Sequence, residues 1–470
     1  MSDELRTPDW VADAVFYQIF PERFANGDPS LDPPDVEPWG GEPTRDNFFG
    51  GDLAGIVAHL DHLTTLGVNA LYLTPIFEAE TNHRYDAVDY FTVDHRLGDL
   101  DAFRRFLAAA HERGIRVVLD AVLNHCGIGH WAFRDVMAHE TASRYADWFT
   151  VTGFPVVSDP EPSYATCSGC WYLPKWHVDN PEVTRHHLDV ARSWIAEGID
   201  GWRLDVPYFV PTAFWRRFRE VVKGLDEDLY IVAEEWREPD QWLTGDTADG
   251  TMNYTLRDLV LAFTADRTTD ATGLADGLNT LWDRLPPAAR PAMLNLLGCH
   301  DTERVLTRHR GDTGATVLAF ALLFAAHGAP MLYYGDEVGM TGENDPGCRG
   351  TMEWDRERWA ADVYDAVLGL SAARRGSVAL RRGDQRLVAL SPDAVAVVRT
   401  AEDEVAVVVV NRGEATTVDL AAVGVDATVW EMRYGRGAAV ATAGAGSLRL
   451  GPGGVAVLVA TDERAGGRSR

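Results

Sequence analysis

The chain has 470 residues, of which 46% are hydrophobic and 24% charged, so it has the composition of a folded protein with a large core and not of a disordered one. Its 43 Lys and Arg against 71 Asp and Glu give a formal net charge of −28, which excludes a nucleic-acid backbone or an anionic membrane as the main partner and favours a neutral substrate. The length predicts two or three domains, or a large barrel with smaller domains attached.

The N-terminal segment MSDELRTPDW is acidic and polar, so no signal peptide is predicted, and no run of 18 apolar residues predicts a membrane helix. The chain contains only two lysines, and the acidic excess suits a salt-rich cytoplasm, although a codon bias towards Ala, Arg and Gly explains it equally well. The five cysteines are few and odd in number, which fits a reduced compartment. We therefore expect a cytoplasmic protein.

Cys167 and Cys170 are the only cysteines with metal-ligand spacing. A structural zinc site would need further ligands nearby, so three interpretations stay open: zinc, a local redox or disulfide role, and ordinary loop thiols.

Short β-branched or aromatic segments alternate with longer amphipathic segments from residue 15 to about residue 375, which predicts repeated βα units around a parallel sheet. Eight such units would close a (β/α)8 TIM barrel. The expected strands lie in residues 15–20, 69–77, 116–125, 201–206, 230–236, 251–255, 293–301 and 329–337. The weakest of these segments is TMNYT at 251–255.

Helical patterns at 100–114 and 181–198 each end on a glycine, as helices often do. Residues 126–180 have no helical period and are rich in Trp, Pro, Gly and Ser, which predicts an inserted domain B after the third strand. After about residue 377, short alternating strands spaced by glycines predict an antiparallel β-sandwich domain. The expected domains are 1–125 and 181–376 for the barrel, 126–180 for domain B, and 377–470 for the C-terminal β domain.

Acids, histidines and an arginine stand at the carboxyl ends of several predicted strands, and in a parallel barrel all these ends face one side. An acid at one strand end is more often a helix cap than a catalyst, but several together predict a carboxylate site. Hydrolysis of a glycosidic bond needs one carboxylic acid and one carboxylate. The residues in question are Asp120, Asn124, His125, Arg203, Asp205, Glu234, His300 and Asp301.

Within this set, Arg203 lies two residues before Asp205, on the same face of the strand, and would keep that carboxylate ionised. Glu234 is followed by Trp236, and apolar surroundings would raise the pKa of its carboxyl, as a general acid requires.

Four segments, DAVLNH (120–125), GWRLDVPYF (201–209), VAEEW (232–236) and LLGCHD (296–301), resemble in order and spacing the signature regions of the α-amylase superfamily, glycoside hydrolase family 13. The resemblance spans about residues 10–460. It implies a retaining hydrolase of α-1,4-glucosidic bonds with a covalent glycosyl-enzyme intermediate and no organic cofactor. The implied catalytic residues are Asp205 as nucleophile, Glu234 as general acid/base and Asp301 as the residue that stabilises the transition state.

The resemblance also implies the residues that bind the sugar. Tyr85 would form the aromatic platform beneath the sugar at the cleaved bond, although a tyrosine that only packs on the barrel rim is the simpler interpretation without the motif. Trp236 would line the acceptor side or serve packing. The remaining implied binding residues are His125, Arg203, His300, Asp345 and Arg349.

LPKW (173–176) and residues 333–355 resemble the neopullulanase, cyclomaltodextrinase and maltogenic amylase group, which implies maltooligosaccharides or cyclodextrins as substrates, with pullulan open. Two features depart from that group. The barrel begins at Trp10 without an N-terminal β domain, so we leave the oligomeric state, including a monomer, open. After the implied nucleophile, Pro207, Tyr208 and Phe209 replace the usual Ala-Asn-Glu, so we leave open whether the chain catalyses hydrolysis or transglycosylation.

The segments FANGDPSLDP (24–33) and FGGDL (49–53) offer oxygen ligands suited to a hard cation and resemble the group's calcium site. Leu31 replaces a usual asparagine, and Asp-rich turns without metal are common. The implied Ca²⁺ ligands are Asn26, Asp28, Asp32, Gly50 and Asp52.

Three other functions compete with this interpretation. A 4-α-glucanotransferase or an α-glucosidase would use the same scaffold and carboxylates. A non-catalytic carbohydrate-binding relative would typically have lost the carboxylates that this chain keeps.

Overall fold

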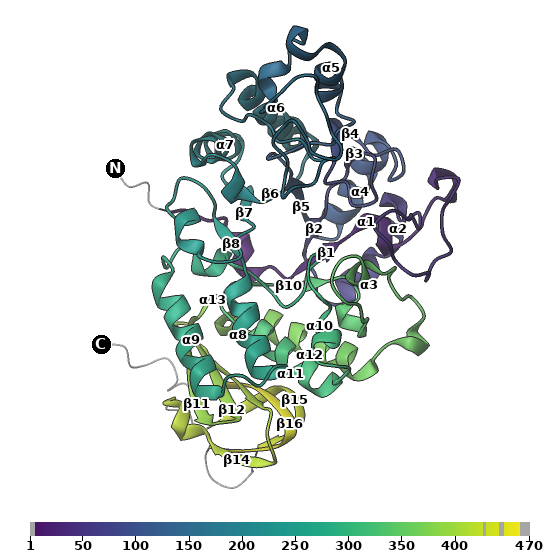
Figure 1. Cartoon of the computed structure of the whole chain (residues 1–470). Coiled ribbons are helices and arrows are strands. Elements are labelled where there is room, and N and C mark those ends of the chain that lie inside the picture. Colours follow the sequence, from purple (N-terminus) through teal and green to yellow (C-terminus); the bar gives the residue numbers. More distant parts are fainter. Residues whose placement is uncertain (1–4, 426–428, 441–445, 461–470) are drawn as a thin grey trace.

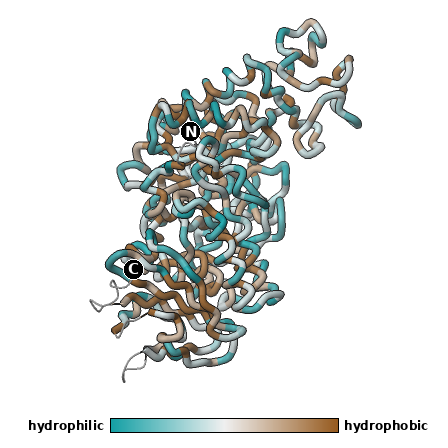
Figure 2. Tube along the Cα trace, turned by 90° about the vertical axis from the view of Figure 1, so that its left-hand side faces the viewer, coloured by the Kyte–Doolittle hydropathy of each residue, from teal (hydrophilic) through white to brown (hydrophobic). Residues whose placement is uncertain are grey.

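A computed structural model describes residues 5–425, 429–440 and 446–460. Figure 1 shows an elongated molecule whose barrel lies between a loop-rich part at one end and a β domain at the other. In a view turned by 90°, hydrophobic residues gather along the strands of that β domain (Figure 2).

Eight parallel strands form a closed barrel in the order β1-β10-β9-β8-β7-β6-β5-β2. The predicted TIM barrel is confirmed, including the weak segment at 251–255. The strands are β1 (Phe16–Ile19), β2 (Ala70–Leu73), β5 (Arg116–Ala121), β6 (Gly201–Leu204), β7 (Tyr230–Ala233), β8 (Gly250–Asn253), β9 (Leu294–Leu296) and β10 (Ala329–Tyr333).

Alternate residues of each strand point to opposite sides of the barrel wall. In β1, Phe16 packs in the barrel interior, whereas Tyr17 and Ile19 pack outwards against the helices. Both sides are buried, so each such aromatic or aliphatic side chain stabilises the fold by about 1.5–3 kcal/mol.

Thirteen α-helices lie in the part of the chain that the structure describes, and none of them has both the length and the apolar character to cross a membrane. They are α1 (Pro21–Phe24), α2 (Leu53–Ala58), α3 (Leu60–Thr65), α4 (Leu100–Glu112), α5 (Trp131–His139), α6 (Pro181–Glu197), α7 (Thr212–Leu225), α8 (Tyr254–Thr264), α9 (Ala271–Arg284), α10 (Val305–Arg308), α11 (Thr313–Ala325), α12 (Ala361–Arg375) and α13 (Val378–Arg382).

The two helices expected from the sequence, α4 and α6, begin and end as their sequences indicate. The side chain of Asp99 accepts the Ala102 amide at the start of α4. Asn180 caps α6 in the same way, with Pro181 in its first turn, and Gly198 ends it in the left-handed conformation at φ +104°.

Between β5 and α6 the chain forms the loop-rich part at the top of Figure 1. Isolated bridges, such as that between Phe149 and Trp176, hold its segments together. The expectation that these residues lack a helix is wrong for α5, whose buried Ala132, Phe133 and Val136 occupy too short a segment to show a period. A hairpin of β3 (Phe77–Ala79) and β4 (Ala87–Val93) precedes this part, and the domain boundaries themselves stay a prediction.

The predicted antiparallel β domain is confirmed, and in the described residues its strands form a single sheet instead of the two sheets of the predicted sandwich. One face of its sheet, with Val408 and Val457, packs against the main core, and the other, with Val407 and Leu458, encloses a core of its own. The strands form one sheet and are β11 (Asp384–Ser391), β12 (Ala394–Thr400), β13 (Val405–Asn411), β14 (Thr416–Asp419), β15 (Trp430–Val440) and β16 (Ser447–Ala460).

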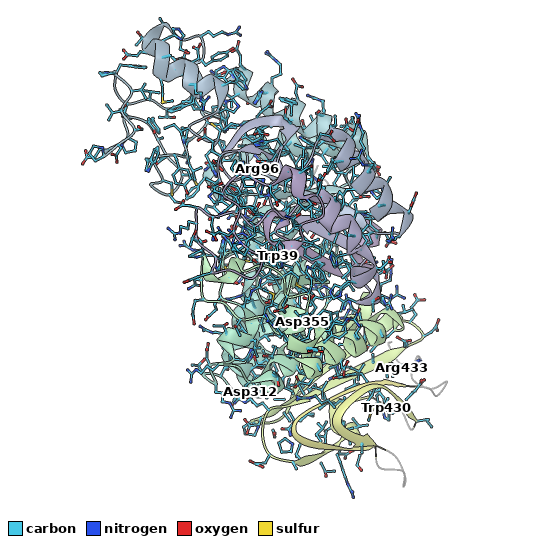
Figure 3. All side chains as sticks on the ribbon, turned by 90° about the vertical axis from the view of Figure 1, so that its right-hand side faces the viewer. Trp39, Arg96, Asp312, Asp355, Trp430 and Arg433 are labelled. Atoms are coloured by element: carbon cyan, nitrogen blue, oxygen red, sulfur yellow. The ribbon has the colours of Figure 1, made fainter. Side chains whose placement is uncertain are left out.

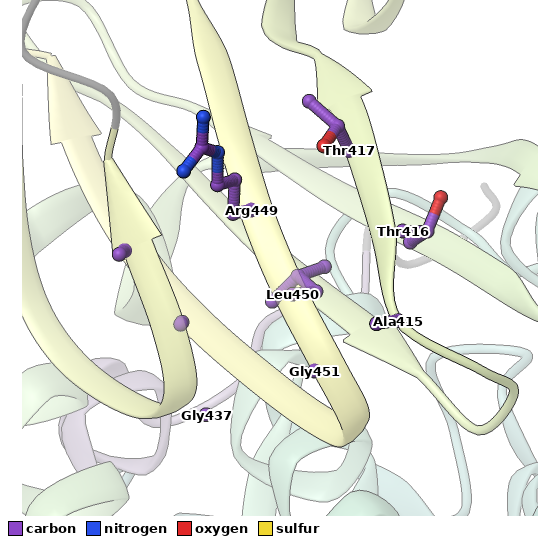
Figure 4. A pocket seen from close by; sticks show the side chains of 9 residues that line it. Ala415, Thr416, Thr417, Gly437, Arg449, Leu450 and Gly451 are labelled. Atoms are coloured by element: carbon purple, nitrogen blue, oxygen red, sulfur yellow. The ribbon is translucent and has the colours of Figure 1, made fainter.

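A pocket of about 530 Å³ lies on this domain, where β16 pairs with β14 on one side and with β15 on the other (Figure 4). Thr416, Thr417 and Arg449 supply its polar groups, and alanines and glycines supply most of the rest. It contains no carboxylate, so the acids singled out in the sequence gather elsewhere.

Candidate active site

The predicted strand-end residues meet at the carboxyl-terminal face of the barrel. Asp120 lies in β5, Arg203 in β6 with Asp205 directly after it, and Glu234 directly after β7. His300 and Asp301 follow β9 after a short turn. The parallel barrel therefore brings together side chains that lie up to about 180 residues apart in the sequence.

Arg203 is the centre of this cluster and is fully buried. Its Nη1 donates to both oxygens of Asp120, at 2.9 and 3.0 Å, and to Asp205 Oδ1 at 2.8 Å. Its Nη2 lies 2.8 Å from Glu234 Oε1 as an ion pair, but without an aligned hydrogen bond. One guanidinium thus contacts three of the buried carboxyl groups.

Asp301 lies on the other side of the cluster and is the most exposed of the four acids, with a third of its side chain accessible. Arg349 Nη2 donates to its Oδ1 at 3.0 Å, and His300 Nε2 lies 3.2 Å from its Oδ2. Arg349 also pairs with Asp345 at 3.0 Å. The predicted residues Asp345 and Arg349 are therefore linked to Asp301 in one network.

Tyr85 joins the two halves of the site. Its hydroxyl donates to Asp120 Oδ2 at 2.9 Å and lies 2.6 Å from His300 Nε2, and its ring stacks on the His300 ring with centroids 5.4 Å apart. These contacts with Asp120 and His300 fix the orientation of the Tyr85 ring, as an aromatic platform beneath a sugar requires.

Two further residues of this network were missed in the sequence. The Tyr72 hydroxyl donates to Asp120 Oδ2 at 2.7 Å, and Gln18 Nε2 lies 2.8 Å from His300 Nδ1. The sequence did contain a sign of both residues, because each is a polar residue in an apolar strand segment: Tyr72 in ALYL and Gln18 in FYQI. A polar group that is buried in this way requires a hydrogen-bond partner.

The charges in the site do not balance. Burial raises the pKa of Asp205 and of Glu234, and neighbouring carboxyls raise both further, whereas Arg203 lowers them. Although burial acts in the opposite direction, the positive charge of Arg349 lowers the pKa of Asp301. Burial lowers the pKa of His125 and of His300 to about 3, so neither adds positive charge at neutral pH. Four acids then face two arginines, which favours one carboxyl that keeps its proton.

His125 is buried, with its Nδ1 3.1 Å from the side-chain Nδ2 of Asn124, and its Nε2 makes no aligned hydrogen bond among the described residues. A buried ring nitrogen that lacks a partner is a group that a sugar hydroxyl could satisfy.

The residues after Asp205 form an apolar surface beside the site. The side chains of Tyr208 and Phe209 are 44% and 43% exposed, and Lys175 Nζ lies 4.8 Å above the Phe209 ring. Val206, directly after Asp205, has a left-handed backbone with φ +35°, which is unusual for a β-branched residue. Its amide donates to Glu234 Oε2 at 2.9 Å.

The relation between Trp236 and Glu234 corrects the sequence argument. Trp236 does not surround the carboxyl with apolar surface, because its indole Nε1 donates to Glu234 Oε1 at 3.1 Å. Trp236 is 37% exposed, and its indole also stacks on the Tyr254 ring with centroids 3.8 Å apart.

The predicted calcium ligands meet only in part. Asn26 Nδ2 donates to Asp32 Oδ1 at 2.8 Å, and Asn26 Oδ1 is buried with no partner in the described part of the chain. A Cβ on Gly50 would lie 2.1 Å from Asp32 Oδ1. The oxygens of Asn26 and Asp32 and the close backbone of Gly50 fit a hard cation.

The other two predicted ligands accept hydrogen bonds from the protein. Asp52 caps α2 and accepts the amides of Gly27, Asp28 and Gly55, whereas the Asp28 carboxylate accepts from Ser30. The neighbouring loop contains Trp39, which is labelled in Figure 3, and its indole donates to the Met352 carbonyl at 3.0 Å.

Cys167 and Cys170 lie at the two ends of a tight turn, in which the Cys170 amide donates to the Cys167 carbonyl at 2.8 Å. Within the described residues, no third His, Cys, Asp or Glu side chain lies close enough to complete a metal site with them. This disfavours zinc and leaves the redox and ordinary-thiol interpretations.

Residues 18–368 match the family model described as "Alpha amylase, catalytic domain". The chain is 46% identical over 414 residues to a cyclomaltodextrinase of Geobacillus thermopakistaniensis, covering 87% of this chain and 70% of that protein. It is 44% identical over 423 residues to neopullulanase 2 of Thermoactinomyces vulgaris, covering 89% and 72%.

Among solved structures, the cyclic alpha-maltosyl-(1→6)-maltose hydrolase of Arthrobacter globiformis is 61% identical and has a TM-score of 0.92, covering 97% of this chain and 100% of that one. That protein has also been solved in complex with cyclic alpha-maltosyl-(1→6)-maltose and with maltose. The chain belongs to the alpha-amylase family of glycoside hydrolases.

Proposed function

We propose that the chain hydrolyses small maltose-based saccharides with retention of anomeric configuration, and that cyclic α-maltosyl-(1→6)-maltose is its preferred substrate. The observation that carries the proposal is the likeness to the Arthrobacter hydrolase, at 61% identity over the whole of that chain. The carboxylate cluster around Arg203 supplies the chemistry that the proposal needs.

The two reacting carboxyls are Asp205 and Glu234. Both contact the same guanidinium, Asp205 at Nη1 and Glu234 at Nη2, which favours the short spacing of about 5–5.5 Å that retention requires over the wider one of inverting enzymes. Arg203 donates an aligned hydrogen bond to Asp205 but not to Glu234. We assign the ionised carboxylate to Asp205 and the transferable proton to Glu234.

In the first step, the Asp205 carboxylate attacks the anomeric carbon while Glu234 gives its proton to the departing glycosidic oxygen. In the second step, Glu234 takes a proton from water, the water oxygen attacks the same carbon, and the bond to Asp205 breaks. Asp301, with its lowered pKa, supplies a negative charge beside the oxocarbenium-like transition state.

The surroundings of this centre would bind the sugar. We propose Tyr85 as the platform beneath it and His125 and His300 as partners of its hydroxyls. Asp345 and Arg349 would bind the next sugar unit along the non-reducing side. Tyr208, Phe209 and Trp236 are exposed aromatic residues that we place on the acceptor side, where they would suit the CH faces of a compact saccharide better than polar residues would.

The bond that is cleaved can be read from the products. The cyclic tetrasaccharide contains α-1,4 bonds within its maltose units and α-1,6 bonds between them. Release of maltose would mean cleavage at α-1,6, and release of isomaltose would mean cleavage at α-1,4, the bond that the family resemblance implies. The solved complex of the Arthrobacter protein with maltose leads us to expect maltose.

The test is product chromatography with the cyclic tetrasaccharide, β-cyclodextrin, maltotriose and pullulan at equal concentration of glucose units. We expect the cyclic tetrasaccharide to be consumed fastest and to yield maltose. Faster turnover of β-cyclodextrin would overturn the substrate assignment. Products longer than the substrate would indicate a 4-α-glucanotransferase, and release of glucose alone would indicate an α-glucosidase.

We further propose that a Ca²⁺ ion would be held by Asn26 Oδ1, the Asp32 carboxylate and the Gly50 carbonyl, and that it would stabilise the loop that precedes α2. Asp28 and Asp52 remain predicted ligands, although their carboxylates already accept hydrogen bonds from backbone amides, which would compete with the ion. A cytoplasmic location and a monomeric state are likewise proposals, the second of which sedimentation can test against the chain mass of 51.8 kDa.

A further inference from the structure

The two oxygens of Glu234 have different surroundings. Oε1 accepts the Trp236 indole N–H at 3.1 Å and lies 2.8 Å from Arg203 Nη2, which is not aligned to donate. Oε2 accepts the backbone amide of Val206 at 2.9 Å. Among the described residues, only Trp236 donates an aligned hydrogen bond to Oε1.

The indole of Trp236 is held in place from one side. It lies nearly parallel to the Tyr254 ring, with an interplanar angle of 17° and centroids 3.8 Å apart. Tyr254 is buried at the start of α8, and its hydroxyl lies 3.5 Å from Cys299 Sγ. The stack fixes the direction of the indole N–H, whereas the exposed side of the ring faces away from Tyr254.

We propose that Trp236 is a positioning residue for the acid/base carboxyl: its N–H occupies Oε1 of Glu234 and so confines the transferable proton to Oε2. This inference rests on the proposed function of Glu234. A proton on Oε1 would point at the indole N–H and at the guanidinium of Arg203, and both would repel it. Among the described residues, Oε2 accepts the Val206 amide alone and has a lone pair left for the proton.

The hydrogen bond also sets the direction in which the pKa of Glu234 responds. A donor to a carboxylate stabilises its ionised form and lowers its pKa. Removal of the indole N–H would therefore raise the pKa of Glu234, and it would let the proton occupy either oxygen instead of Oε2 alone.

Trp236→Phe tests the proposal, because it keeps an aromatic ring on Tyr254 and removes the N–H. We expect kcat/KM on the cyclic tetrasaccharide to fall about tenfold, the effect of one lost hydrogen bond. With α-maltosyl fluoride, whose leaving group departs without a proton, we expect a fall of less than about twofold. The alkaline limb of the pH profile should move to higher pH by about half a unit to one unit.

Trp242→Phe is the matched control. Trp242 lies in the same loop and donates its indole N–H to Glu235 Oε2 at 2.7 Å, so the substitution removes the same chemical group from a neighbouring glutamate. The alkaline limb should not move in this variant. Thermal unfolding of both variants, together with turnover of the fluoride, checks that each one folds.

Equal losses on both substrates, or an unmoved alkaline limb in Trp236→Phe, would overturn the proposal and indicate that Trp236 only stacks on the sugar. A wild-type protein that hydrolyses neither substrate would instead overturn the proposed function. The two failures are therefore distinguishable.

Discussion

At the scale of single residues, the site is decided by the charges around Arg203. It pairs with Asp120, Asp205 and Glu234 in a place where an unpaired charge is costly. The acids outnumber the arginines, so the uncompensated negative charge favours protonation of one carboxyl. This is the same property that a general acid needs.

Asp205→Asn follows from this balance. An amide cannot form the covalent glycosyl intermediate, so we expect hydrolysis of the cyclic tetrasaccharide and of maltotriose to fall by several orders of magnitude. The substitution also removes one of four crowded acids, so the temperature of unfolding should not fall. Activity assays and calorimetry check both parts, and substantial residual turnover would contradict the role given to Asp205.

At the scale of elements, the start of α2 combines a helix cap with the proposed calcium loop. Asp52 accepts three backbone amides, and Asn26 and Asp32 lie beside each other at Gly50. With the ion held by Asn26, Asp32 and Gly50 as proposed, the cap and the cation would draw on different carboxylates, so mutation can separate them and can show whether Asp52 is also a ligand.

We expect Asp52→Ala to destabilise the protein by about 2 kcal/mol with or without calcium, since a cap is lost. Calcium should raise the unfolding temperature of the wild type and of Asp52→Ala, but not that of Asp32→Ala. Calorimetry in EDTA and in calcium chloride measures this. A calcium effect that survives in Asp32→Ala would show that the ion binds elsewhere.

At the scale of the whole molecule, stability should depend on buried neutral histidines. Burial lowers the pKa of His125, His130 and His300 to about 3 and that of His327 to about 2. The unfolded chain binds protons at these groups below about pH 6.5, whereas the folded chain does not. The contribution of these histidines to the free energy of unfolding is therefore fully present above pH 6.5 and is lost as the pH falls towards 3.

Between these pH values, the free energy of unfolding should fall by about 1.4 kcal/mol per pH unit for each such histidine. His130 lies at the start of α5, outside the catalytic cluster, and its Nδ1 accepts the Ala132 amide. His130→Asn keeps a capping side chain and removes one titrating group, so urea unfolding between pH 7 and 5 should show a shallower slope. An unchanged slope would exclude His130 as a contributor.

The sequence by itself determined the barrel and the face on which its acids meet. Alternating strand and helix patterns specify βα units, and parallel strands place Asp120, Asp205 and Glu234 at one end wherever the loops go. The order of four motifs then determined the family. These features are local or periodic, so a linear pattern records them.

Only the tertiary structure decided how the side chains pair. Gln18 and His300 are 282 residues apart, and no pattern in the chain links them. The direction of the Trp236 N–H was likewise not predictable, because the same residue offers an apolar face or a donor depending on where its ring stacks. Hydrogen bonds depend on angles and on partners from distant segments, which sequence spacing does not encode.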